Sequence, residues 1–388
     1  MNQLLAYIDR RQQEMLQFLE QIVNIDSGTF DKAGVDRVGG ILARRLETLG
    51  FSVERVPQIQ YGDHLLARKE GTEDPRIVLI GHMDTVFPAG TAAARPFRIA
   101  NGLAYGPGVL DMKGGLTCLV YALEALQATA HPSFTAMKMS VVLNSDEEMG
   151  SPTSTPLIEQ EARQAQTACI FEPARPGGEY VIARKGVARY SLTVRGRAAH
   201  AGTQPEHGRS AILEMAHKIV ALHRLADPST GTTVSVGVVR GGERYNVIPE
   251  QAFAEVDLRA RNMAELQRVD KLMREIVANR VVADTSAELS GGVVFPPMVQ
   301  TAGSKRLFEA LRAAGRQLGL DLRGTTTGGG SDGNTTSQFT PTLDGMGPRG
   351  SEAHSEREYM EVATLAERTK VLALFLASWP ETIAKLDG

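Results

Sequence analysis

The sequence contains few of the residues that would place it in a specialised structural class. It has two cysteines and one tryptophan among 388 residues, and aromatic side chains make up 5% of the total. Two cysteines without paired spacing exclude a disulfide framework and a cysteine-based zinc knot. Both lie among apolar neighbours, Cys118 in "LTCLVYAL" and Cys169 in "TACIFEP". We therefore expect two buried thiols in a reducing compartment.

An excess of one charge and long apolar runs are also absent. The formal net charge of −3 gives no electrostatic basis for binding nucleic acid or an acidic membrane. The first stretch, "MNQLLAYIDRRQQEMLQFLEQIV", carries charges throughout, so it predicts an amphipathic helix instead of a signal peptide or membrane span. With 42% hydrophobic and 22% charged residues, the chain is expected to be globular. Since the first stretch does not predict a signal peptide, we expect a cytoplasmic location.

The length and the alternation of patterns predict two domains. Helical periodicity covers residues 4–23, 35–49, 115–127 and 362–378. Strand patterns cover residues 51–56, 76–81, 137–144 and 167–172. Alternating strands and helices favour an α/β fold with a mostly parallel sheet covered by helices on both faces.

The pattern changes from about Arg184. Longer alternating strands appear in "VARYSLTVRG", "TTVSVGVVRGG" and "QAFAEVDLRAR", with helical patterns near residues 209–224 and 263–278. These features are typical of an α+β domain. We expect residues 184–295 to be inserted into a catalytic domain formed by residues 1–183 and 296–388.

Polar residues follow the apolar strands at the edge where α/β proteins bind ligands. Each of these residues has a side chain that can bind a metal or transfer a proton. They are His82 and Asp84 in "GHMD", Glu147 and Glu148 in "SDEE", and Glu172 in "FEP". Two further candidates are Asp111 in "GPGVLDMKGG" and His354 in "EAHS". Histidine nitrogen and carboxylate oxygen are ligands that zinc accepts, so the set predicts a metal centre.

Two zinc ions about 3.5–4 Å apart can share one carboxylate and one water. Asp111 suits the bridging position because its glycine neighbours let the backbone approach closely. His82 and Glu172 then remain for one ion, and Glu148 and His354 for the other. Three carboxylates, two zinc ions and one hydroxide sum to zero charge, which a dry cleft tolerates.

Two carboxylates remain without a metal. Neighbouring residues in extended chain point in opposite directions, so Glu147 is not expected to share an ion with Glu148. Glu147 is predicted to be the general base, and Asp84 is predicted to accept the second ring N–H of His82. The remaining histidines that lack such a context are expected to be solvated: His64, His131, His207, His217 and His223.

The ordered motifs "GHMDTV", "GPGVLDMKGG", "NSDEEMGS", "FEP", "AAHAG", "NVIP", "VDLRAR", "GGGSD" and "AHS" resemble those of the dinuclear zinc peptidases and deacylases related to glutamate carboxypeptidase (glucarpidase) and acetylornithine deacetylase. The resemblance extends from about Ala6 to Leu376. It implies the same seven site residues in the same roles, two Zn²⁺ ions per subunit with Co²⁺ or Mn²⁺ as substitutes, and a cis peptide between Asp111 and Met112. It also implies that the inserted domain is a dimerisation or lid domain in a homodimer.

The resemblance assigns four residues outside the metal ligands. It implies that His200 in "GRAAHAG" stabilises the oxyanion in the partner's active site, a role that contributes roughly 3–4 kcal/mol. It implies that Asn246 and Arg259 hold a substrate carboxylate and that Gly329 provides close-approach backbone near the substrate. Taken without the resemblance, His200 is a surface loop histidine and Arg259 a salt-bridged strand residue.

Two positions depart from the glucarpidase pattern. Phe295 in "VVFPP" and Thr326 before "GGG" fall where such enzymes carry arginines, which weakens the case for a C-terminal glutamate and allows an apolar or aromatic residue. The sequence predicts a zinc carboxypeptidase that releases a C-terminal amino acid from a small peptide. An N-acyl-amino-acid deacylase is the alternative, and a non-catalytic peptide- or metal-binding protein is a third reading.

Overall fold

The computed structural model describes residues 2–386, which form two compact units. The first unit extends to Ala183 and also contains Gln300–Thr326 and the described chain from Ser331 on. The second unit comprises Arg184–Val299 and Thr327–Gly330. Each unit has its own core of buried apolar side chains.

A six-stranded sheet forms the centre of the first unit, in the order β1-β2-β6-β3-β7-β16. The strands are β1 (Ser52–Val56), β2 (His64–Lys69), β3 (Arg76–His82), β6 (Lys138–Asn144), β7 (Thr167–Ile170) and β16 (Thr342–Leu343). The pairings β6–β3, β3–β7 and β7–β16 are parallel, and those of β1 with β2 and of β2 with β6 are antiparallel. The sheet is therefore mixed, with a parallel part that contains the predicted strand ends.

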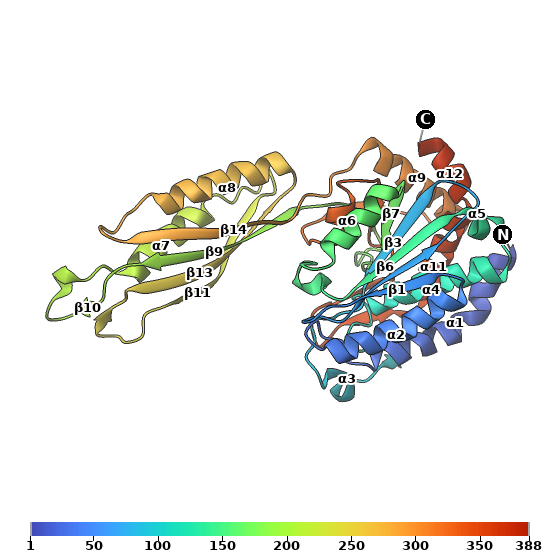
Figure 1. The fold of residues 1–388 in the computed structure, drawn as a ribbon, viewed down its shortest axis with the longest axis horizontal. Coiled ribbons are helices and arrows are strands. Elements are labelled where there is room, and N and C mark those ends of the chain that lie inside the picture. Colours follow the sequence, from blue (N-terminus) through green and yellow to red (C-terminus); the bar gives the residue numbers. More distant parts are fainter. Residues whose placement is uncertain (1, 387–388) are drawn as a thin grey trace. The chain divides into compact units, whose positions relative to one another are not determined.

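Helices cover both faces of this sheet, which confirms the predicted α/β class. Ile77 and Leu79 of β3 face the larger core with α1 (Asn2–Val23), α2 (Lys32–Thr48), α4 (Lys113–Ala128) and α11 (Val362–Ala377). Val78 and Ile80 face the opposite side, together with Ile158 of α6 (Thr155–Gln164). Figure 1 shows α1, α2, α4 and α11 on one side of the strands and α6 on the other. Burial on both faces explains why "IVLI" is continuously apolar.

A smaller antiparallel sheet positions two loops of the first unit. Its order is β17-β18-β5-β4, from strands β4 (Arg98–Ala100), β5 (Leu103–Tyr105), β17 (Gly350–Ser351) and β18 (Tyr359–Glu361). His354 lies in the connection between β17 and β18, and Asp111 follows β5. Because β18 pairs with β5, these two loops leave the same small sheet.

The second unit is a four-stranded antiparallel sheet in the order β11-β13-β9-β14. Its strands are β9 (Gly186–Arg195), β11 (Thr233–Gly241), β13 (Gln251–Ala260) and β14 (Ser286–Phe295). Alternate residues of β9 and β13 pack against α7 (Ala211–His223) and α8 (Met263–Ala278) (Figure 1). A short ribbon of β10 (Ala199–His200) and β12 (Val247–Ile248) is attached to this unit.

The remaining elements are short or peripheral: α3 (Thr91–Ala94), α5 (Pro132–Ala136), α9 (Ala302–Arg316), α10 (Asp332–Thr336), α12 (Trp379–Leu386), the 3₁₀ turns η1 (Glu147–Met149) and η2 (Pro205–His207), and the paired strands β8 (Tyr180–Arg184) and β15 (Gly324–Thr327). Both cysteines are buried and unpaired, as expected. Among the described helices, none combines the length and apolar character that a bilayer span requires.

Candidate metal centre

Five predicted ligands converge at one edge of the first unit. Three of them follow the parallel strands: His82 ends β3, Glu148 lies in η1 after β6, and Glu172 lies two residues beyond β7. Since β6 and β7 both pair in parallel with β3, their carboxyl ends meet at one edge. The loops of the smaller sheet bring Asp111 and His354 to the same place.

The two oxygens of Asp111 face different histidines. Oδ1 lies 3.3 Å from His82 Nε2, and Oδ2 lies 3.1 Å from His354 Nε2. His82 Nε2 is also 3.6 Å from Glu172 Oε1, whereas His354 Nε2 is 3.3 Å from Glu148 Oε2. Asp111 therefore stands between two histidine–glutamate pairs, the arrangement that a bridging carboxylate requires.

The donor atoms fit divalent cations. Asp111 Oδ1 and Glu148 Oε1 are buried and have no hydrogen-bond partner within the described chain. A buried carboxylate oxygen without a donor is unfavourable, and a cation beside it would remove the penalty. Ligand atoms of His82, Asp111 and Glu148 lie within 4.8 Å of one another, as do those of His82, Glu147 and Glu172. Histidine and carboxylate donors at this spacing match zinc chemistry.

The two histidines are strongly basic in this environment. Burial alone would lower the pKa of His82, but the nearby carboxylates of Asp111, Asp84 and Glu172 raise it well above its ordinary value. Hydrogen bonds with Asp111 and Glu148 raise the pKa of His354 to about 11. Without a metal, the carboxylates therefore favour the protonated imidazoles, whose charge partly balances theirs.

The glutamates of η1 respond to the same crowding of charge. Burial and the charge of Glu172 raise the pKa of Glu147 well above its ordinary value. Burial also raises the pKa of Glu148, although His354 acts in the opposite direction. Burial would raise the pKa of Asp111 as well, but the imidazoles of His354 and His82 lower it below its usual range.

Asp84 connects the strand end to the acidic turn. Its Oδ1 accepts from the backbone N–H of Glu147 at 3.3 Å, and its Oδ2 accepts from that of Glu148 at 3.3 Å and from Thr29 Oγ1 at 2.8 Å. His82 Nδ1 lies 3.0 Å from the Asp84 carbonyl oxygen and 3.5 Å from its carboxylate. In this structure the His82 ring is thus hydrogen-bonded to the backbone carbonyl of Asp84. The Asp84 carboxylate holds the backbone of the turn that carries Glu147 and Glu148.

The assumption that Glu147 and Glu148 lie in extended chain is wrong. They begin the 3₁₀ turn η1, because the strand ends at Asn144 and Asp84 holds both backbone N–H groups. A 3₁₀ helix has three residues per turn, so successive side chains still point about 120° apart. The side chains of Glu147 and Glu148 therefore still diverge, but the cause is the 3₁₀ geometry and not an extended chain.

Two carboxylates that the sequence reasoning did not assign support the site. Glu358 is buried and accepts the backbone N–H groups of Gly108 at 3.0 Å, Leu110 at 2.8 Å and Asp111 at 3.0 Å. Asp332, in the quoted motif "GGGSD", accepts from Asn144 at 2.8 Å and from Ser151 at 2.5 Å, on either side of the acidic turn. The apolar strand patterns in the sequence do not indicate Glu358, because this residue is far along the chain from any of the long strands.

The loop at Asp111 has two further features. The peptide bond between Asp111 and Met112 is cis, which confirms what the resemblance implied. A Cβ atom at Gly115 would lie 2.0 Å from the Phe171 carbonyl oxygen, so only glycine allows the start of α4 to approach the chain before Glu172 this closely.

The prediction of solvated histidines is wrong for His64. This side chain is fully buried, with Nδ1 3.0 Å from Ser145 Oγ and Nε2 3.0 Å from Thr153 Oγ1. It lies in β2, a strand that the sequence pattern did not predict, and two hydroxyl partners compensate for its burial. His131 is half-buried and bonds Ser133, and the other three are exposed.

Four of the predicted residues belong to the second unit. His200 in β10 and Asn246, which directly precedes β12, are exposed, and the Asn246 carbonyl accepts from the backbone N–H of Ala201. His200 Nδ1 accepts from the backbone N–H groups of Gly202 at 3.1 Å and Thr203 at 3.2 Å. A neutral His200 ring therefore carries its proton on Nε2, which is left as a donor.

Arg259 forms a two-point ion pair with Asp257, at 2.9 and 3.2 Å, and donates to the Gly328 carbonyl at 2.8 Å. The neighbouring Gly329 accepts from Arg184 through its carbonyl at 3.2 Å. The guanidinium of Arg259 is therefore held in one orientation.

Comparison with known proteins gives consistent matches. The model of "Peptidase family M20/M25/M40" matches residues 78–378. Carboxypeptidase G2 from Pseudomonas sp. (strain RS-16) is 29% identical over 371 residues, covering 93% of this chain and 88% of that protein. Acetylornithine deacetylase from Myxococcus xanthus is 32% identical over 290 residues, covering 69% and 72%. The structure of the Bacillus subtilis YXEP protein, described as a dinuclear metal-binding peptidase from the M20 family, superimposes with a TM-score of 0.69 at 17% identity over 96% of this chain and 99% of that one.

Proposed function

The chain belongs to peptidase family M20/M25/M40 and is a metal-dependent hydrolase, and we propose that it is a dinuclear zinc carboxypeptidase. In this proposal it hydrolyses the amide bond next to a free α-carboxylate and releases the C-terminal amino acid. The observation that carries the proposal is the position of Asp111, whose two oxygens face His82 and His354 separately. A site for one metal ion would need only one histidine beside Asp111.

The distances support one division of the ligands between the two ions. His82 and Glu172 would hold one ion, Glu148 and His354 the other, and Asp111 would bridge them. When bound, the ions act as Lewis acids that polarise the scissile carbonyl and make a water acidic at neutral pH. Zinc is proposed over magnesium because two histidine nitrogens take part.

Glu147 is the proposed general base and acid. It would take a proton from the attacking water on a carboxylate oxygen and pass it to the leaving nitrogen. Burial and the charge of Glu172 raise its pKa, so its carboxylate is a stronger base than that of an exposed glutamate. Asp84 holds the backbone of Glu147 and thereby aims the base.

The second unit provides the proposed substrate contacts. Arg259 presents a planar fork suited to a carboxylate, with Gly329 near it. Asn246 neighbours His200 at the other end of β13, so it would reach such a carboxylate only in a partner subunit's site. The Nε2–H donor of His200 supports its role at the oxyanion of a partner subunit's site. A homodimer through this unit is part of the proposal, as is a cytoplasmic location.

An N-acyl-amino-acid deacylase is the second candidate, because acetylornithine deacetylase is among the relatives. Both reactions use the same attack on an amide next to a carboxylate, and they differ in the group on the acyl side. A non-catalytic binding protein is disfavoured because the family match is to hydrolases and Glu147 is retained beside the ligands.

The test is a panel of dipeptides and N-acyl amino acids with varied C-terminal residues, assayed on chelator-treated protein before and after zinc is restored. Zinc should restore hydrolysis, and elemental analysis should find two ions per chain. Asp111→Asn is the control variant in which an amide replaces the proposed bridging carboxylate. Hydrolysis that does not depend on metal, or that persists in the Asp111→Asn control at the original rate, would refute the proposal.

A further inference from the structure

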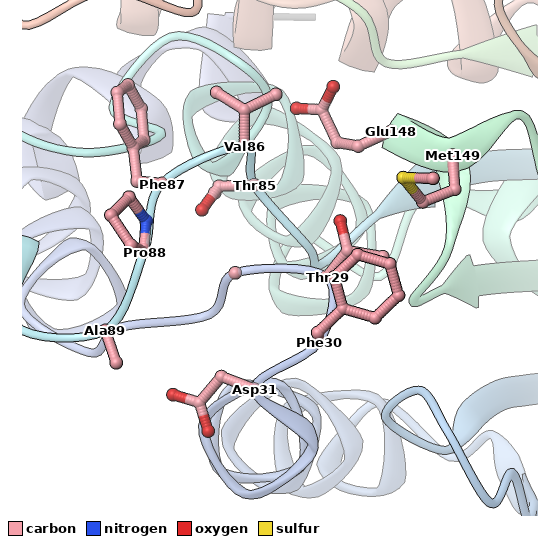
Figure 2. A pocket seen from close by; sticks show the side chains of 11 residues that line it. Thr29, Phe30, Asp31, Thr85, Val86, Phe87, Pro88, Ala89, Glu148 and Met149 are labelled. Carbon is pink, nitrogen blue, oxygen red and sulfur yellow. The ribbon is translucent and has the colours of Figure 1, made fainter. Parts of the chain in front are cut away.

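A pocket of ≈ 650 Å³ adjoins the metal centre within the first unit. Glu148, one of the proposed ligands, forms part of its wall, and Met149 is the next residue of the same turn. The segments Gly28–Asp31 and Thr85–Ala89 complete it. Figure 2 shows Glu148 and Met149 on one side, Val86 and Phe87 on another, and Phe30 facing Met149. A group that enters this pocket therefore lies next to the reacting centre.

The pocket is lined by apolar side chains that remain exposed. Phe30, Val86 and Met149 are 59%, 42% and 43% exposed, although each has buried polar or apolar neighbours in sequence. Large apolar side chains gathered around one hollow are typical of a binding surface. Their positions are set by the site itself, since Val86 lies two residues beyond Asp84 and Met149 follows Glu148.

Hydrogen bonds fix the wall that carries Phe30. Thr29 donates to the Asp84 carboxylate at 2.8 Å and to the Thr85 carbonyl at 3.1 Å, and Thr85 donates to the Ser27 carbonyl at 2.8 Å. The Phe30 ring also lies 5.8 Å from that of Tyr61, between centroids. The pocket is consequently preformed and tied to the residue that orients His82 and Glu147.

The described wall of the pocket offers no cationic side chain to an acidic occupant. None of the described residues that line the pocket is cationic, and Glu148 and Asp31 are acidic. Asp31 is engaged as the N-cap of α2, where it accepts from Gly34. Arg95 stacks on the Phe87 ring and donates to the Glu356 carbonyl, and it is not part of the lining. The free carboxylate of a substrate thus has no partner here.

We propose that this pocket binds the acyl side of the substrate, and that it selects an apolar or aromatic acyl side chain over acetyl or an acidic group. The inference rests on the proposed amide hydrolysis and deepens it. The carboxylate end of the substrate requires a cation, which the pocket does not provide, so the occupant is the group across the scissile bond. The volume of ≈ 650 Å³ lies in the usual range of ligand pockets, and an acetyl group would fill less of it than an amino-acid residue or an arylacyl group.

The experiment compares acyl groups on a fixed leaving residue. N-acetyl, N-hexanoyl, N-phenylacetyl and N-succinyl derivatives are prepared in three sets, on alanine, phenylalanine and glutamate, and kcat/KM is measured with zinc-loaded protein. In each set that is cleaved, hexanoyl and phenylacetyl should exceed acetyl and succinyl by about 10-fold or more. Equal rates, or a preference for acetyl or succinyl, would overturn the assignment.

Variants at Phe30 test the pocket directly. Phe30→Ala should lower the phenylacetyl-to-acetyl ratio by about 10-fold, and Phe30→Arg should raise the succinyl-to-acetyl ratio by placing a cation at the rim. Ile59→Ala is the matched control, because Ile59 is fully exposed in the same unit and outside the lining. Ratios that change equally in the control and in both Phe30 variants would reject the pocket. Failure of every set with zinc-loaded protein would instead reject the hydrolase proposal on which the pocket depends.

Discussion

Metal loading should depend steeply on pH, because the proposed ligands hold protons when the ions are absent. His82 Nε2 and His354 Nε2 lie 3.1–3.6 Å from carboxylate oxygens that retain those protons. The pKa of His82 is raised well above its ordinary value in spite of burial, and that of His354 is raised to about 11 by Asp111 and Glu148. Both shifts favour protonated imidazoles in the metal-free protein, so binding has to displace protons from them.

The size of the effect follows from counting protons. If two protons leave for each pair of ions, the apparent association constant rises about 100-fold per pH unit, or roughly 2.7 kcal/mol. The sign is fixed, since lower pH favours the protonated metal-free form and weakens binding. Ordinary histidines, with a pKa of about 6.5, would release almost no protons between about pH 7.5 and 8.5, which leaves only the one proton lost when a bridging water becomes hydroxide. That interval therefore separates the two cases.

Calorimetric titration of zinc into metal-free protein at pH 8, repeated in buffers of different ionisation enthalpy, counts the protons released. We expect about two or more per pair of ions, and competition with a chelator should give the slope with pH. His207→Ala is the control, because this histidine is 67% exposed and outside the site. Release of about one proton per pair or fewer would refute the argument that the carboxylates hold the imidazoles protonated, because a bridging hydroxide alone accounts for one.

Three further substitutions test separate parts of the site. Glu147→Gln should keep its zinc by elemental analysis and lose turnover by about 10²–10⁴-fold, and near-normal kcat would remove Glu147 as the base. His200→Ala should be inactive alone, but mixing it with Asp111→Ala should restore activity in hybrid dimers; verified hybrids without activity would contradict a site shared between subunits. Glu358→Gln places an amide N–H against one of three backbone donors, so denaturant unfolding should show a loss of about 1–3 kcal/mol, and unchanged stability would show that these hydrogen bonds matter little.

The sequence predicts those helices and strands whose apolar pattern follows directly from the faces that they bury. Residues 76–81 are apolar without interruption because β3 is covered on both faces, and the predicted helices around residues 4–23 and 362–378 correspond to α1 and α11. Once β3, β6 and β7 are recognised as strands, their shared edge places His82, Glu148 and Glu172 together. Sequence spacing alone does not show how near they are, since that depends on the pairing register.

The errors concern residues whose environment is made by distant partners. His64 begins a short strand with mixed polarity, and its burial depends on Ser145 and Thr153, 81 and 89 residues away. The same applies to Glu358, which meets the Asp111 loop only because β18 pairs with β5. No periodicity within a short window reports such contacts, so a buried polar residue of this kind is invisible until the fold is known.

Asp84 connects the proposed catalytic residues with the pocket. Its carboxylate accepts from Thr29, Glu147 and Glu148, and its backbone carbonyl lies 3.0 Å from His82 Nδ1. The same buried residue thus contacts a proposed metal ligand through its carbonyl, and through its carboxylate it fixes the backbone of the proposed base and anchors the wall that carries Phe30. A shift of Asp84 would move all three together, because packed interiors transmit small displacements. The proposed acyl pocket and the proposed base therefore share a single structural support, so the side chain chosen by the pocket and the bond reached by the base are positioned relative to each other within the first unit.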